Sequence, residues 1–100
     1  MYRYRLHTYP KTSEDYDRMV ALGREWDELA GAKGWAQGTG WTMLTGDGNE
    51  LVSDFDYPDL AAFQREGENQ EKDPDFAQFL RKMDAVERTR PSRDELLATL

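Results

Sequence analysis

The chain has 100 residues, no cysteine and a formal net charge of -7, from 13 lysine and arginine residues against 20 aspartate and glutamate residues. This acidic balance argues against nucleic acid or an anionic membrane surface as a partner. The lack of cysteine excludes disulfides and thiolate sites, and a single histidine does not supply a usual zinc ligand set. We therefore expect no metal site. The length of 100 residues predicts one domain over residues 1–100.

The charged start MYRYR lacks the apolar stretch of a signal peptide, and no apolar run approaches the roughly 20 residues that span a bilayer. The expected location is therefore the cytoplasm.

Residues 2–9 alternate as a strand does. One face is mainly apolar and carries Tyr2, Tyr4, Leu6 and Thr8. The other carries two guanidinium groups and the only histidine, from Arg3, Arg5 and His7.

The hydroxyls of Thr12 and Ser13 can cap a helix that follows this strand. Its apolar residues recur at steps of three and four and are Tyr16, Met19, Val20, Leu22, Trp26 and Leu29. Residues 35–44 alternate again and predict a strand, with Trp35 and Trp41 on one face. A turn at residues 46–49 then predicts a hairpin to a strand over residues 51–57.

Pro58 is placed to begin a short helix that ends at the polar residues 67–72, and Asp73-Pro74 begins another helix. A last strand is predicted over residues 86–89. Ser92-Arg93-Asp94-Glu95 matches a capping box and predicts a short C-terminal helix. The order is that of an α+β, ferredoxin-like βαββαβ fold with a four-stranded antiparallel sheet.

Four segments carry a resemblance to a known superfamily: YRYRLHTY, GWAQGTGW, FDYPDLAAF and DPDFAQFLRKM. The chain resembles the dimeric α/β-barrel superfamily over nearly its full length, and its small NIPSNAP-like branch in particular. The resemblance implies a homodimer that pairs through the open face of each sheet. The superfamily also looks similar to antibiotic-biosynthesis monooxygenases, polyketide cyclases and stress-induced proteins.

The charged face of the first strand offers one candidate site. In this fold the first and third strands are antiparallel neighbours, so Arg3 and Arg5 can lie beside Asp54 and Asp56. An ion-pair ladder is one interpretation, because paired charges are the usual form of buried charge. A catalytic site is the second, with His7 as general base and the arginines stabilising an anion. Exposure to solvent is the third.

Aromatic side chains form a second candidate, since 12 of the 100 residues are aromatic. Rings opposed across the sheet and the helices can form a core, or they can leave a cleft for a flat apolar ligand. The candidate ligand-binding residues are Tyr4, Trp26, Trp35, Trp41, Phe55, Tyr57, Phe63 and Phe79. Gly38 and Gly40 share a strand face, which predicts close approach of a partner sheet or of a ligand.

Two functions follow from these features. The first is a small-molecule-binding protein, acting without a cofactor as a monooxygenase or cyclase on an aromatic or polyketide-like substrate. The alternative is a non-catalytic dimer of the NIPSNAP-like or stress-responsive type. A cavity beside a polar group distinguishes them, because an enzyme needs enclosed space for its substrate.

Overall fold

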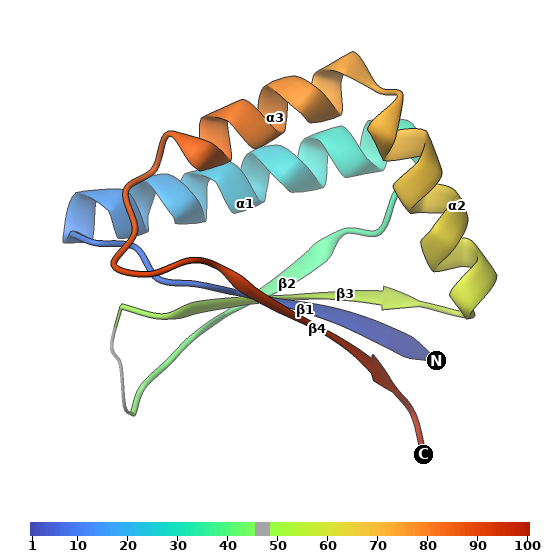
Figure 1. Cartoon of the computed structure of the whole chain (residues 1–100), viewed down its shortest axis with the longest axis horizontal. Helices are drawn as coiled ribbons and strands as arrows, with labels where there is room; N and C mark the ends of the chain where they lie inside the picture. Colours follow the sequence, from blue (N-terminus) through green and yellow to red (C-terminus); the bar gives the residue numbers. More distant parts are fainter. Residues whose placement is uncertain (46–48) are drawn as a thin grey trace.

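Helices cover one face of a four-stranded antiparallel sheet, and the other face is uncovered (Figure 1). This computed structural model describes residues 1–45 and 49–100. Its strands lie in the order β2-β3-β1-β4 and span β1 (Tyr2–Thr8), β2 (Gly38–Thr42), β3 (Leu51–Tyr57) and β4 (Arg93–Ala98). Its helices are α1 (Ser13–Lys33), α2 (Leu60–Glu71) and α3 (Pro74–Asp84). The predicted ferredoxin-like fold is confirmed, with a sheet that is open in the single chain.

The core forms where α1 and α3 pack over the sheet. The Thr12 hydroxyl accepts the backbone N–H of Asp15, whose carboxylate accepts the backbone N–H of Thr12, so both ends of a capping box are present. The buried residues of α1 follow at helical spacing and meet α3 and the loop after it. The core residues are Met19, Leu22, Trp26, Ala30, Phe79 and Val86.

The register of β1 and β3 sorts their side chains by face. Tyr4 lies opposite Phe55, and Arg5 lies opposite Asp54. Because directly opposed residues in a sheet point the same way, the first pair faces the helices and the second pair faces the open side. The predicted separation of an apolar and a charged face on β1 is therefore present.

The C-terminal helix that we predicted is wrong, because Arg93–Ala98 forms β4 and pairs with β1. The predicted strand over residues 86–89 is also wrong. That segment is a connection with one isolated bridge, between Pro10 and Arg88. Without β4, one edge of β1 would leave its backbone N–H and C=O groups unpaired. Pairing with residues 93–98 satisfies these groups along the whole edge, whereas a helix cap would satisfy only a few backbone groups.

Two further boundaries differ from those predicted. Strand β2 begins at Gly38 and not at Trp35, because the backbone N–H groups of Trp35 and Ala36 are bound by Ala30 and Glu66 instead of by a strand. Helix α2 continues past Gly67 to Glu71. The predicted turn at residues 46–49 lies outside the described residues except for Asn49.

No helix in residues 1–45 and 49–100 combines the length and the apolar character that crossing a membrane requires. The cytoplasmic location expected from the sequence stays a prediction.

Candidate functional site

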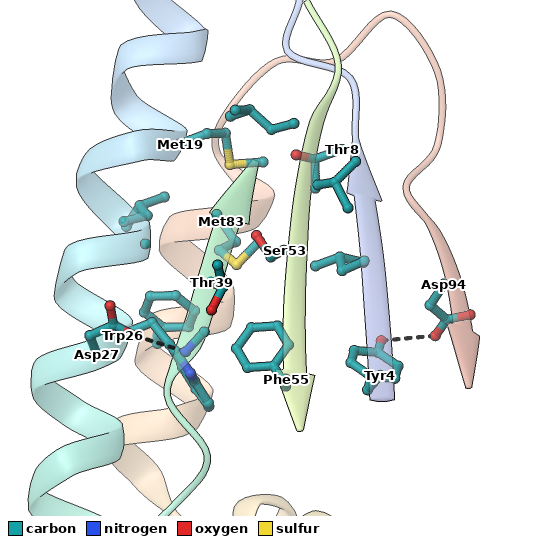
Figure 2. Close-up of a pocket in the computed structure, with 18 of the residues that line it drawn as sticks. Tyr4, Thr8, Met19, Trp26, Asp27, Thr39, Ser53, Phe55, Met83 and Asp94 are labelled. Atoms are coloured by element: carbon teal, nitrogen blue, oxygen red, sulfur yellow. Dashed lines mark hydrogen bonds between the residues drawn. The ribbon is translucent and has the colours of Figure 1, made fainter. Parts of the chain in front are cut away.

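A cavity of about 620 Å³ lies between the helices and the sheet. All three helices and all four strands contribute to its wall, and Figure 2 shows part of that wall. Met19 and Thr8 lie towards one end of the close-up, and Trp26, Phe55 and Tyr4 lie towards the other. The volume falls within the range of about 300–1,000 Å³ that is typical of ligand pockets. A cavity beside Tyr4 is therefore present, and it is partly open to solvent.

Aromatic rings make up much of the cavity wall. The wall includes six of the side chains named from the sequence as ligand-binding candidates, which are Tyr4, Trp26, Phe55, Tyr57, Phe63 and Phe79. These rings also contact one another, with the Trp26 and Phe79 centroids 5.2 Å apart and those of Trp26 and Phe55 6.1 Å apart at right angles. Such contacts hold the rings in place and give the cavity firm, flat apolar surfaces.

The other two tryptophans lie outside this wall. Trp35 stacks on Trp26 with centroids 5.8 Å apart, so it supports a ring of the wall from behind. We expected Trp41 to share a strand face with Trp35 and to belong to this aromatic set, and this is wrong. Trp41 pairs with Val52 and its indole N–H donates to Asp54 at 3.1 Å, which places it on the open face. The later start of β2 accounts for the error, because alternation does not extend from residue 35 to residue 41.

A tyrosine and a carboxylate meet at the edge of the cavity. The Tyr4 hydroxyl donates a hydrogen bond of 2.9 Å to Asp94 Oδ2 (Figure 2). Asp94 is exposed and also lines the cavity, so the pair lies where the cavity meets solvent. Burial, and then the hydrogen bond to Asp94, raises the pKa of Tyr4 to about 12. Sequence reasoning missed Asp94 because it placed this residue in a helix.

A second tyrosine–carboxylate pair is formed by Tyr57 and Glu66, and both residues line the cavity. Glu66 also accepts the backbone N–H of Ala36 at 2.6 Å and the side-chain N–H of Gln70 at 3.3 Å. Burial, followed by the hydrogen bond to Glu66, raises the pKa of Tyr57 above its ordinary value. Glu66 therefore ties α2 to the ends of β2 and β3, a role that no sequence motif signals.

The charged face of β1 is an ion-pair ladder on the open side of the sheet. Arg3 donates to both carboxylate oxygens of Asp56 at 2.7 and 3.0 Å, and Arg5 donates to both oxygens of Asp54 at 2.8 and 3.1 Å. These two-point contacts hold the pKa values of Asp54 and Asp56 below their usual range. The two arginines are thus matched with the two aspartates that the strand order predicts.

His7 continues the ladder and lies between two carboxylates. Its Nδ1 is 2.7 Å from Glu50 Oε1, and its Nε2 is 2.6 Å from Glu95 Oε1. An imidazole donates to both oxygens only when both nitrogens carry hydrogen. The contact with His7 lowers the pKa of Glu95. A catalytic role for Arg3, Arg5 and His7 stays a prediction, and each already has a carboxylate partner.

Within residues 1–45 and 49–100, no group of three or more metal-ligating side chains is arranged to hold an ion. The polar groups of the cavity wall are hydroxyls, carboxylates, backbone amides, the Arg24 guanidinium and the Gln70 side-chain amide. In particular, Asp27 Oδ1 accepts the backbone N–H of Gly38 at 3.0 Å at the end of the cavity near Trp26 (Figure 2).

No family model and no curated protein sequence matches the chain. Its structure is similar to solved structures, among them a NIPSNAP domain protein from Burkholderia xenovorans. That match has a TM-score of 0.79 at 15% identity and covers 100% of this chain and 95% of the other. An antibiotic biosynthesis monooxygenase matches with a TM-score of 0.73 at 17% identity, covering 100% and 99% of the two chains. The chain has the fold of NIPSNAP domain proteins and antibiotic biosynthesis monooxygenases.

A third match with this fold is SnoaB, a cofactor-independent oxygenase from Streptomyces nogalater. It has a TM-score of 0.65 at 16% identity and covers 98% of this chain and 91% of the other. The predicted resemblance is thereby confirmed at the level of the fold. Some of these similar structures are NIPSNAP domain proteins and others are oxygenases. The shared fold therefore does not by itself identify a reaction.

Proposed function

We propose that the chain binds a flat, mainly apolar small molecule between its helices and its sheet. The observation that carries this proposal is the cavity of about 620 Å³, walled by aromatic rings and bordered by the Tyr4–Asp94 pair. An aromatic ligand can stack on these rings while a polar substituent reaches the hydroxyl or the carboxylate. A protein used only for assembly has no need of such a space.

The chemistry that we propose is that of a cofactor-independent monooxygenase or cyclase on an aromatic or polyketide-like substrate. Asp94 takes a proton from an acidic carbon or hydroxyl of the ligand. The Tyr4 hydroxyl keeps its own proton near neutral pH, because its pKa is about 12, and donates to the oxyanion that forms. This arrangement assigns the acid–base work to Tyr4 and Asp94, since Arg3, Arg5 and His7 lie on the opposite face of the sheet.

Both reactions balance without a resident cofactor. In the monooxygenase reaction, dioxygen is the co-substrate: a methylene carbon of the ligand becomes a carbonyl, and its two hydrogens leave with the second oxygen atom as water. In the cyclase reaction, the deprotonated carbon attacks a carbonyl carbon of the same ligand. The proton held by Asp94 then passes to the new alkoxide.

The test is binding first and turnover second. Titration with a planar phenol such as 2-naphthol is expected to quench tryptophan fluorescence, because Trp26 lines the cavity. Tyr4→Phe and Asp94→Asn should bind this probe within about threefold of the unchanged protein, because the rings remain. With anthrone as substrate, both variants should lose at least tenfold in dioxygen consumption. Absence of quenching would instead support the non-catalytic alternative.

We also propose that the open sheet face meets a second copy of the chain. Trp41 is 54% exposed and Leu97 is 37% exposed on this face, beside the ion-pair ladder. A face that carries both signs of charge in rows is complementary to itself under a two-fold axis. Light scattering should report twice the mass of one chain, and Trp41→Glu should shift it towards one chain. A single-chain mass for the unchanged protein would end this proposal.

A further inference from the structure

Two hydroxyl groups of the cavity wall are left unused by the fold. They belong to Thr8 on β1 and Ser53 on β3, and both residues line the cavity. Neither side chain makes a hydrogen bond within the described part of the chain. The Tyr4 hydroxyl of the same wall, in contrast, donates to Asp94. The Thr8 and Ser53 hydroxyls are therefore free to bind a molecule that enters the cavity.

Burial makes an unpartnered hydroxyl unfavourable at Thr8, which is only 6% exposed. Valine would fill nearly the same space with the branched shape that strands prefer, and it would bring no hydroxyl that needs a partner. Among the described residues, Arg88 Nε is the only fully shielded side-chain nitrogen or oxygen that lacks a partner. The Thr8 hydroxyl is therefore not sealed among packed atoms, and it reaches the space of the cavity.

The register of β1 and β3 places the two hydroxyls close together. Ser53 lies opposite Leu6, which is two positions from Thr8 along β1. All three residues lie on the same face as Tyr4, so their side chains point towards the helices. Diagonal neighbours of this kind are about 7 Å apart. One oxygen atom between them can accept a hydrogen bond from each hydroxyl.

This hydroxyl pair lies away from the Tyr4–Asp94 pair. In Figure 2, Thr8 lies towards the end of the cavity that holds Met19, and Tyr4 lies towards the other end. Four positions of β1 separate Thr8 from Tyr4, which corresponds to about 13 Å. Two hydrogen bonds of about 2.8 Å use part of this distance. Roughly 8 Å therefore remains between the two oxygen atoms of a ligand that reaches both pairs.

We propose that Thr8 and Ser53 form an oxygen-binding subsite that selects the ligand. The ligand carries a carbonyl or hydroxyl oxygen at this end, in addition to the group that meets Tyr4 and Asp94. The two hydroxyls bind that oxygen in place of water. This inference rests on the proposed function, because it assumes a ligand in the cavity. It adds two specificity-determining residues and the position of a second polar group on the ligand.

The experiment compares two probes with the same ring skeleton, 2-naphthol and 2,6-dihydroxynaphthalene, by isothermal titration calorimetry. The second probe has a hydroxyl at each end, so the unchanged protein should bind it at least fivefold more tightly. Thr8→Val and Ser53→Ala should each lower this preference, and the double variant should reduce it to less than twofold. The affinity for 2-naphthol should change less than twofold in all three variants. Thr8→Ser keeps a hydroxyl and should keep the preference.

Thermal unfolding separates a role in ligand binding from a role in the fold. Thr8→Val should leave Tm unchanged or raise it, because the lost hydroxyl has no partner within the described part of the chain. Thr89→Val is the matched control, since it makes the same chemical change at a residue that does not line the cavity. This control should keep the fivefold preference.

The possible results distinguish this inference from the proposed function. If the unchanged protein binds neither probe, the proposed function fails and this inference fails with it. If the unchanged protein binds both probes equally well, or if the double variant keeps the preference, only the oxygen-binding subsite is overturned. A fall in Tm for Thr8→Val would also overturn it, because the hydroxyl would then serve the fold. Loss of the preference in Thr89→Val would do the same.

Discussion

Arg5 and Asp54 face each other across β1 and β3 and are joined by two hydrogen bonds of 2.8 and 3.1 Å. Asp54 is only 4% exposed and also accepts the indole N–H of Trp41. A buried carboxylate needs such partners, because its desolvation is otherwise unfavourable. This relationship makes Asp54 the centre of the ladder on the open face.

Asp54→Asn should therefore lower the free energy of unfolding by about 2 kcal/mol, as expected for loss of charge-assisted hydrogen bonds with one partly exposed partner. Urea denaturation measures this change. Asp56→Asn is the matched control, and its effect should be smaller, because the side chain of Asp56 is 47% exposed. Equal losses in the two variants would contradict the central position of Asp54.

The ladder also predicts loss of stability in acid. The folded-state pKa values of Asp54, Asp56 and Glu95 lie below their usual range, so the unfolded chain binds more protons than the folded one in acid. The stabilisation is therefore present above the unfolded-state pKa values of about 4 and is lost as the pH falls through the lower folded-state values. Urea midpoints between pH 2.5 and 6 should fall towards acid, and less steeply in Asp54→Asn. Parallel curves would contradict this.

The Tyr4 hydroxyl should lose its proton only at a pH well above that of an ordinary tyrosine. Its folded-state pKa of about 12 means that the phenol stays protonated well above the ordinary value near 10. The difference in absorbance at 295 nm between the unchanged protein and Tyr4→Phe should therefore develop near pH 12. Asp94→Asn should move that step towards lower pH, because it removes the carboxylate that opposes a phenolate. A step near pH 10 in the folded protein would contradict the burial of this hydroxyl.

Glu66 should contribute to stability as a connection between α2 and the sheet. Glu66→Gln weakens its hydrogen bonds with Ala36 and Tyr57, and we expect a loss of about 1–2 kcal/mol in the free energy of unfolding. The measurement is again urea denaturation. Glu68→Gln, two residues along the same helix at an exposed position, should change it by less than about 0.5 kcal/mol. Similar losses in both variants would show that Glu66 has no special role.

The features that could be predicted from the sequence include those that depend on alternation along a single strand. The two faces of β1 could be read from Tyr2 to His7, and the pairing of Arg3 and Arg5 with Asp54 and Asp56 followed from the strand order of the fold. Most of the aromatic wall was also predictable, because helical spacing places Trp26 and Phe79 on inward faces. These features depend on local periodicity and on one known topology.

The part that could not be predicted depends on competition between distant segments. Arg93–Ala98 follows a helix-capping signal and has no polar–apolar alternation, yet it pairs with the otherwise unpaired edge of β1. No local pattern therefore placed Asp94 beside the cavity. Trp41 was misplaced for a similar reason, because contacts with α1 and α2 delay the start of β2.

The pairing of β1 with β4 also bears on the order of folding. The two residues that border the cavity, Tyr4 and Asp94, are 90 positions apart in the sequence. Closing so long a loop is entropically unfavourable and comes late when shorter-range contacts are available. One edge of β1 stays unpaired until β4 pairs with it. The proposed acid–base pair is thus assembled only when the sheet is complete, so no partly folded chain holds both groups in place.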